Sequence, residues 1–295
     1  MTAPRQVLPG TTYLVTRRCS QRQFLLRPSA TTNQVFRFVL ALASRRYGIQ
    51  VHAFCVLSNH FHLVVTDPCA RLPAFHQFLD SLVARAINTS HGRRESFWAP
   101  GSFSAVALVA PTDVLEKTAY VLANPVAAGL VRRGRLWPGL WSAPEQIGGD
   151  PVRTPRPRRF FDPKGYLPEA IDLELSLPPG FGTAGAFREA LLAALSDREA
   201  QAERTVRRGF LGVAKVLAQR PTRRPASEEE HRRLRPRVAA RDRWRRIEAL
   251  GQLLQFLHSY RRAWAARRAG ALDVIFPAGT YHLRVAHGVP CAGYG

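Results

Sequence analysis

The stretch Asn59–Val65 (NHFHLVV) constrains the fold of this chain more than any other feature. Its alternating pattern and its aromatic and β-branched residues predict a β-strand. Successive side chains of a strand point to opposite faces, so His60 and His62 share one face while the apolar residues around them share the other. A strand packed on a core through its apolar face would present two neighbouring imidazoles, a rigid half-site for a divalent metal. A strand histidine taken alone is more often an ordinary core or surface residue.

Length and composition describe a globular protein. The 295 residues, 46% of them hydrophobic, allow one large domain or two ordinary ones. No apolar run approaches the roughly 20 residues that span a bilayer, and the N-terminus lacks the apolar segment of a signal peptide. The four cysteines are scattered without a C-x-x-C pair, which favours neither a disulfide framework nor a zinc ribbon. We expect a cytoplasmic protein with no membrane partner.

The charge of the chain indicates its partner. Basic residues outnumber acidic ones by 43 to 21, which gives a net charge of +22. Lysine occurs only at Lys117, Lys164 and Lys215, so nearly all of the positive charge is arginine. A G+C-rich gene would explain arginine in place of lysine, but it would not explain the excess of basic residues. Because the arginine fork binds phosphate in a bidentate manner, nucleic acid is the expected partner, ahead of an anionic membrane surface.

The first half of the chain alternates strand and helix signals. The second helix pattern after the histidines opens at Pro111-Thr112-Asp113, with Thr112 or Asp113 as cap. We expect it to end near Asn124-Pro125, since a residue before proline is disfavoured in the helical region. A tight turn at Ser58-Asn59 should pair the two strands around it antiparallel. The predicted strands are 11–18, 49–57, 59–66 and 103–109, and the predicted helices are 31–47 and 72–87.

The second half has a different character. Residues 148–179 are rich in proline, glycine and arginine, which is typical of a linker or of an irregular wrapping segment. Helical patterns fill 184–268, interrupted by the charged stretch 219–237, and residues 273–289 predict a strand, a turn and a second strand. We therefore expect a first domain at 8–145, a linker at 146–183, and a basic, mainly helical region at 184–295.

Tyr120 and Asn124 are the next candidate site residues. They are four apart in a predicted helix, so they lie one turn from each other on the same face and could present a phenol and a carboxamide together. Taken alone, Tyr120 would more often be a core residue of an amphipathic helix. Asn124 could serve as a metal ligand or as the cap of the helix end, and the sequence leaves both interpretations open.

Two stretches in combination, 51–65 (VHAFCVLSNHFHLVV) and 120–131 (YVLANPVAAGLV), resemble the REP-associated tyrosine transposases. These belong to the HUH superfamily of single-strand DNA transposases, named for two histidines that flank a hydrophobic residue. Arg17-Arg18 and Phe97-Trp98 also fit the family pattern, and the resemblance covers roughly residues 8–143. Many relatives have Met-Pro where this chain has Leu57-Ser58, a change that removes no ligand.

The resemblance implies a ferredoxin-like α+β fold, which is an antiparallel sheet with helices packed on it. It also implies a mechanism of DNA cleavage. Tyr120 would be the nucleophile, and His60 and His62 would bind Mg²⁺ or Mn²⁺ with Asn124 as third protein ligand. A free phenol has a pKa near 10, so a cation that polarises the scissile phosphate spares the enzyme a strong base. Attack on phosphorus would give a phosphotyrosine and a free 3′-hydroxyl. The adduct keeps the bond energy, so the strand can be rejoined without ATP.

The implied substrate is a hairpin of single-stranded DNA, a repetitive extragenic palindrome with a short guide sequence at its foot. Arginine pairs in the helices of the C-terminal half suggest that this half extends the DNA-binding surface, with dimerisation or partner docking as the alternative. A homodimer, with a site shared between two chains, is left open. Trp98 could stack on an unpaired base or pack in the core. The residues expected to contact DNA are Arg17, Arg18, Arg22, Arg27, Arg93, Arg94 and Trp98.

Three functions therefore compete. The favoured one is an enzyme that cleaves and rejoins hairpin DNA through Tyr120. The second is a domesticated protein that binds palindromic DNA without catalysis. The third is a metal-dependent nuclease that uses water and in which Tyr120 is structural.

Overall fold

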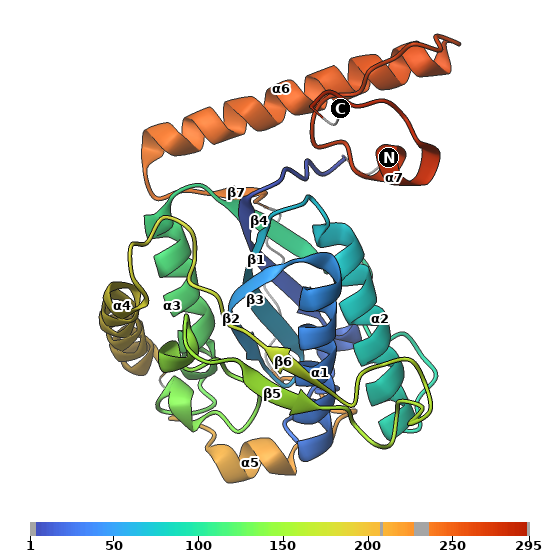
Figure 1. Cartoon of the computed structure of the whole chain (residues 1–295). Coiled ribbons are helices and arrows are strands. Elements are labelled where there is room, and N and C mark those ends of the chain that lie inside the picture. Colours follow the sequence, from blue (N-terminus) through green and yellow to red (C-terminus); the bar gives the residue numbers. More distant parts are fainter. Residues whose placement is uncertain (1–3, 207–208, 227–235, 294–295) are drawn as a thin grey trace.

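The computed structural model describes residues 4–206, 209–226 and 236–293. Its N-terminal part alternates strands and helices closely as the sequence predicts (Figure 1). The elements are β1 (Thr11–Arg18), α1 (Ala30–Tyr47), β2 (Gln50–Val56), β3 (His60–Asp67), α2 (Leu72–Ser90), β4 (Ser104–Leu108) and α3 (Pro111–Ala127). The single-turn helices η1 (Ser20–Arg22), η2 (Gly134–Leu136) and η3 (Pro144–Gln146) lie in the connections.

The central sheet has the strand order β2-β3-β1-β4-β7. Its first four strands pair antiparallel, and with α1 after β1 and α2 after β3 they form the βαββαβ arrangement of a ferredoxin-like fold. The predicted α+β class is confirmed. One strand departs from the antiparallel prediction: the two-residue β7 (Val238–Ala239) joins the edge parallel to β4.

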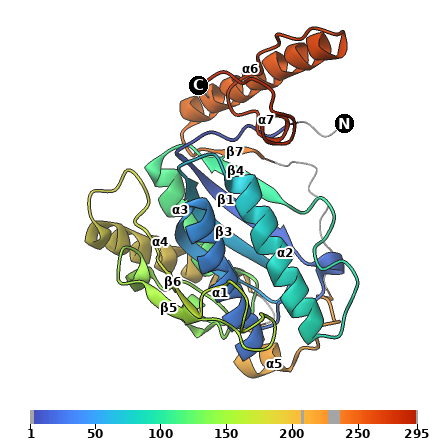
Figure 2. The same cartoon turned by 45° about the vertical axis from the view of Figure 1, so that its right-hand side comes forward.

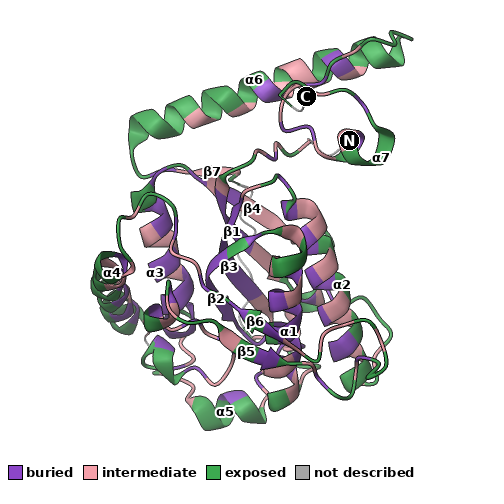
Figure 3. Ribbon diagram, in the orientation of Figure 1, coloured by how far each residue is buried: buried purple, intermediate pink, exposed green. Residues whose placement is uncertain are grey.

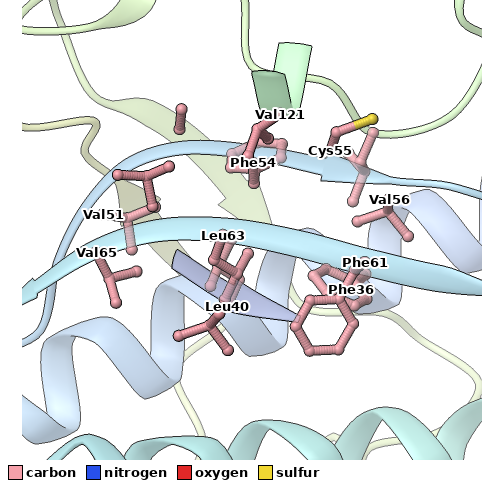
Figure 4. Packing of buried hydrophobic residues seen from close by; sticks show 14 of the residues in the cluster. Phe36, Leu40, Val51, Phe54, Cys55, Val56, Phe61, Leu63, Val65 and Val121 are labelled. Carbon is pink, nitrogen blue, oxygen red and sulfur yellow. The ribbon is translucent and has the colours of Figure 1, made fainter. Parts of the chain in front are cut away.

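Helices cover both faces of this sheet (Figure 2). Phe61, on the apolar face of β3, meets Phe36 of α1 edge to face, with ring centroids 5.1 Å apart. Figure 4 shows Leu63 and Val65 pointing to the same side of β3, toward Leu40 of α1. The opposite face carries α3, whose Tyr120 ring packs against His62. The predicted alternation of β3 therefore separates an apolar core layer from a polar site layer.

Local signals position the helices around the sheet. Ser29 caps α1 by accepting a hydrogen bond from the amide of Thr32, and Gly48 ends the helix in the left-handed conformation. At the end of β3, the buried Asp67 carboxylate accepts from the amides of Cys69, Arg71 and Leu72. It thereby satisfies free N–H groups at the start of α2. At α3, Ala110 occupies the cap position in place of the predicted Thr112 or Asp113, and its amide donates a hydrogen bond to the Asp113 carboxylate at 3.0 Å.

The proline-, glycine- and arginine-rich segment wraps around the domain, which was the second of the two interpretations of its composition. Its strands β5 (Val152–Pro155) and β6 (Ala170–Leu173) form a hairpin that packs on α1. Helix α4 (Ala184–Thr205) then packs along α3 (Figure 1). Phe161, Ile171 and Phe187 belong to the same core cluster as the central sheet. The linker and the first C-terminal helix thus complete the core of the N-terminal part.

The remaining C-terminal elements are α5 (Val213–Ala218), α6 (Arg243–Arg268) and α7 (His282–His287). Helix α6 lies across one end of the molecule and is largely exposed; its buried residues are Phe256 and Ala263 (Figure 3). The strand–turn–strand prediction for 273–289 is wrong: that stretch contains α7 and an isolated bridge between Phe276 and Cys291. A small apolar cluster, which includes Phe276, Leu283 and Val289, stabilises this local arrangement.

Residues 6–7 of the N-terminal segment lie against residues 279–280, just before α7. The amide of Val7 donates to the carbonyl of Gly279 at 3.0 Å, and Gln6 forms a bridge with Thr280. Gly279 has a φ of +86°, and a Cβ there would lie 2.5 Å from the Gln6 side chain, so the close approach requires glycine. Among the described helices, none is both long and apolar enough to span a membrane.

Candidate active site

His60 and His62 lie side by side on β3, as their spacing predicts. Their ring centroids are 4.8 Å apart and their planes are nearly perpendicular, at 89°. Thr16 lies on β1 directly opposite His62, and its hydroxyl is 2.7 Å from His62 Nδ1. His62 Nε2 is buried and has no hydrogen-bond partner among the described residues. A buried nitrogen without a partner costs free energy unless a ligand engages it.

Both imidazoles are uncharged at neutral pH. Burial, reinforced by the positive charges of Arg18 and Arg22, lowers the pKa of His60 to about 4. Burial also holds the pKa of His62 well below its usual range, and the neighbouring His60 and Arg18 act in the same direction. A neutral imidazole offers a nitrogen lone pair, which is the form that binds metals.

Tyr120 reaches this pair from α3. Its ring centroid lies 5.6 Å from that of His62, with the rings edge to face at 73°. The residue is only partly buried. Lys117, one turn earlier on α3, holds its ammonium 5.6 Å from the centre of the Tyr120 ring. The predicted nucleophile and the two histidines are thus neighbours although they come from separate elements, α3 and β3.

Asn124 lies one helical turn beyond Tyr120, inside α3. The prediction that this helix ends near Asn124-Pro125 is wrong: α3 continues through Pro125 to Ala127, and Ala128 is the C-cap. Pro125 has no amide hydrogen, so it gives up one intrahelical bond. The indole of Trp141 braces the same turn by donating to the carbonyl of Leu122 at 2.9 Å. Asn124 is 8% exposed and does not occupy the cap position, which removes the capping interpretation.

The two neighbouring imidazoles could hold a divalent cation. The described residues hold no cluster of three or more histidine, cysteine or acidic side chains that could bind a metal. Two imidazole nitrogens, with the amide oxygen of Asn124 as the predicted third ligand, would suit Mn²⁺ better than Mg²⁺ because manganese accepts nitrogen more readily. The unpartnered His62 Nε2 is the structural observation that supports a ligand here.

The predicted DNA-contacting arginines fall into two groups. Arg18 is exposed, and together with Arg22 it lies close enough to lower the pKa of His60 electrostatically. Arg94 is exposed as well. Arg27 is engaged with the carbonyl of Leu217, and Arg93 pairs with Glu95 at 3.6 Å.

Arg17 and Trp98 lie on the other face of the sheet. Arg17 pairs with Asp80 of α2 at 3.2 Å, and His76 reaches the same carboxylate oxygen at 3.0 Å. Trp98 is 8% exposed and donates from its indole to the carbonyl of Asp80, which corresponds to the core-packing interpretation. These side chains and Arg85 line a cavity of about 720 Å³.

Three further residues lie at the site but were not predicted as site residues from the sequence: Thr16, Asn59 and Lys117. Thr16 could be found only from the register of β1 against β3. Asn59 adjoins the first histidine, and its Oδ1 lies 2.7 Å from His60 Nδ1. The signal for Lys117 was its place one turn before Tyr120 in a chain with three lysines.

Among known proteins, similarity to this chain is found in solved structures. No family model matches the chain, and no curated protein matches it by sequence. One similar solved structure is a REP-associated tyrosine transposase bound to a REP hairpin, at 22% identity and a TM-score of 0.40, covering 47% of this chain and 81% of the other. Another is a candidate transposase from Deinococcus radiodurans, at 16% identity and a TM-score of 0.30, covering 41% and 95%.

Proposed function

We propose that this protein is a transposase-type enzyme that binds hairpin single-stranded DNA and cleaves and rejoins it through a phosphotyrosine at Tyr120. The observation that carries the proposal is the meeting of Tyr120 with His62, whose buried Nε2 has no partner among the described residues. The phenol lies beside two uncharged histidines that could bind a metal. A tyrosine with a purely structural role would not require these neighbours. The motif resemblance and the net charge of +22 support DNA as the substrate.

In the proposed cleavage step, Tyr120 Oη forms a bond to the scissile phosphorus and loses its proton to solvent. The bond from phosphorus to the 3′ oxygen breaks, and that oxygen leaves with the electron pair and takes up a proton. Attack by a 3′-hydroxyl on the phosphotyrosine reverses these changes, releases Tyr120 and joins two DNA ends. The number of phosphoester bonds is conserved, so no external energy source is needed.

The residues of the chain divide this work. His60, His62 and Asn124 would hold the Mg²⁺ or Mn²⁺ ion, which when bound neutralises charge on the phosphate and stabilises the transition state. Lys117 places a positive charge beside the Tyr120 ring, where it can attract the phosphate. Arg18 and Arg22 add positive charge next to His60 and would follow the strand as it enters the site.

The test is a denaturing gel of the protein incubated with hairpin oligonucleotides and Mn²⁺ or Mg²⁺. We expect a covalent protein–DNA band with the natural chain and none with Tyr120→Phe. Tyr166→Phe is the matched control, because Tyr166 is 91% exposed and outside the site. Cleavage that persists in Tyr120→Phe would support the water-using nuclease, and hairpin binding without cleavage under all conditions would support the domesticated DNA-binding protein.

A further inference from the structure

Asn59 occupies a fixed position between β2 and β3, directly before the first histidine of the site. Its backbone carbonyl accepts from the amide of Cys19 at 2.8 Å. Its side-chain Nδ2 donates to the carbonyl of Arg22 at 3.3 Å. That contact fixes the orientation of the amide, because only Nδ2 has hydrogens to donate to a carbonyl. The Oδ1 atom is left to face His60 Nδ1, 2.7 Å away.

This contact determines which nitrogen of His60 carries the proton. An amide oxygen can only accept, so the hydrogen of the 2.7 Å bond must belong to Nδ1. A neutral imidazole has one N–H, and Nε2 is therefore left with a free lone pair. Thr16 does not impose the same choice on His62, because a hydroxyl can either donate to Nδ1 or accept from it.

We propose that Asn59 is a positioning residue that holds His60 in the Nδ1–H tautomer and so prepares Nε2 as its metal-binding nitrogen. The inference deepens the proposed function and rests on it for the identity of the ligand. The orientation of His60 would be set before metal arrives, so binding would require neither a proton shift nor a ring rotation. Outer partners of metal-binding histidines typically contribute about 10- to 100-fold to metal affinity.

Two substitutions separate this role from a structural one. Asn59→Ala removes the acceptor, and we expect His60 to lose its preference for the Nδ1–H form and Mn²⁺ affinity to fall by about 10- to 100-fold. Asn59→Asp keeps an acceptor for Nδ1 but cannot donate to Arg22. We expect Asn59→Asp to keep the Nδ1–H tautomer and to bind Mn²⁺ at least as tightly as the natural chain.

The measurements are ¹⁵N NMR of the histidine rings in the metal-free protein at neutral pH and calorimetric titration with Mn²⁺. A His60 protonated at Nε2 in the natural chain would overturn the proposal. So would an Asn59→Ala variant with unchanged tautomer and affinity, or an Asn59→Asp variant that fails as badly as Asn59→Ala. The tautomer is read without DNA or metal, so it can hold even if no covalent adduct forms and the proposed reaction is wrong.

Discussion

At the scale of single residues, the polar face of β3 depends on histidines that stay uncharged at neutral pH. His52 shows how the fold enforces this away from the candidate site. It is fully buried, with Nδ1 2.8 Å from the carbonyl of Ser176 and Nε2 2.7 Å from the Thr66 hydroxyl. Nδ1–H donates and Nε2 accepts, so the neutral ring is fully satisfied. A lone histidine in the strand before His60 is more often a surface residue, but the structure shows His52 in the core.

A pH dependence of stability follows from His52. Burial lowers the pKa of His52 from 6.5 to about 4. Between pH 4 and 6.5, His52 is therefore protonated in the unfolded chain but not in the folded chain. Stability is therefore full above pH 6.5 and falls as the pH drops toward 4, by about 2 to 3 kcal/mol for this residue. Chemical denaturation at several pH values should show a shallower fall for His52→Gln than for the natural chain. The exposed His258→Gln should keep the natural slope, and equal slopes for all three proteins would contradict the account.

Asn124 gives a second prediction for a single residue. Its place inside α3, one turn from Tyr120, leaves metal ligation as its predicted role. Asn124→Ala should weaken Mn²⁺ binding about tenfold or more, while Asn124→Asp should retain or strengthen it, since a carboxylate oxygen is a better ligand for a hard cation. Calorimetric titration of the three proteins decides. Unchanged affinity in Asn124→Ala would show that the amide is not a ligand.

At the scale of elements, local periodicity predicts structure well where local preferences decide it. The predicted strand at 59–66 and the predicted helix at 31–47 agree closely with β3 and α1. Periodicity does not predict structure where distant contacts override local preference. Helix α3 passes through Pro125 because the surrounding residues are buried and Trp141 braces the turn. The two-residue β7 has no periodic signal at all, since its pairing with β4 exists only in the folded chain.

The same distinction applies to the candidate site. His60, His62 and Tyr120 could be named from spacing, and the structure brings them together. Their partner Thr16 comes from another strand, and its contact depends on a register that no spacing in the sequence reveals. Arg17 and Trp98 were predicted beside the site, yet strand alternation places Arg17 opposite Thr16, on the face of α2.

Helix α6 carries the hypothesis that the C-terminal half extends the DNA surface. At about 1.5 Å per residue it is roughly 39 Å long, and nearly all of it is exposed. Arg243, Arg261 and Arg268 are separated by whole helical turns, so they lie on one face of the helix. The arginine pairs at 207–208 and 232–233 lie outside the described residues.

Replacing these three arginines with glutamine should weaken binding of a hairpin oligonucleotide and reduce its salt dependence. If each contacts a phosphate, the slope of log K against log salt falls by about 2 to 3. Fluorescence anisotropy across salt concentrations measures this slope. The exposed arginines Arg45, Arg135 and Arg204 form a control set with the same loss of charge. An equal effect of both sets would contradict a specific role for α6.

At the scale of the whole molecule, the predicted division at residues 145 and 183 does not coincide with a division of the core. Phe187 and Leu191 of α4 are fully buried in the cluster that contains the central sheet. Arg198 of α4 also pairs with Glu116 of α3 at 2.6 Å. The proline-, glycine- and arginine-rich segment that precedes α4 packs on α1 through β5 and β6, an arrangement that composition alone does not predict.

This shared core predicts the result of truncation. A chain ending at residue 145 loses the apolar partners of α1 and α3 and should show no cooperative thermal transition. A chain ending at residue 242 keeps α4 and β7 and should unfold cooperatively, because the separate small cluster around Phe276 lies beyond it. Calorimetry or circular dichroism of both chains distinguishes them. Cooperative unfolding of the shorter chain would show that α4 is dispensable to the core.

The central claim is that Tyr120 becomes covalently attached to DNA, and mass spectrometry of the adduct tests it most directly. The protein–DNA complex would be trimmed with nuclease, digested with protease and sequenced by fragmentation. The account predicts a nucleotide attached through phosphate to Tyr120, in the peptide that also contains Asn124. A nucleotide attached to any other residue, or cleaved DNA with an unmodified Tyr120 peptide and no adduct, would contradict it.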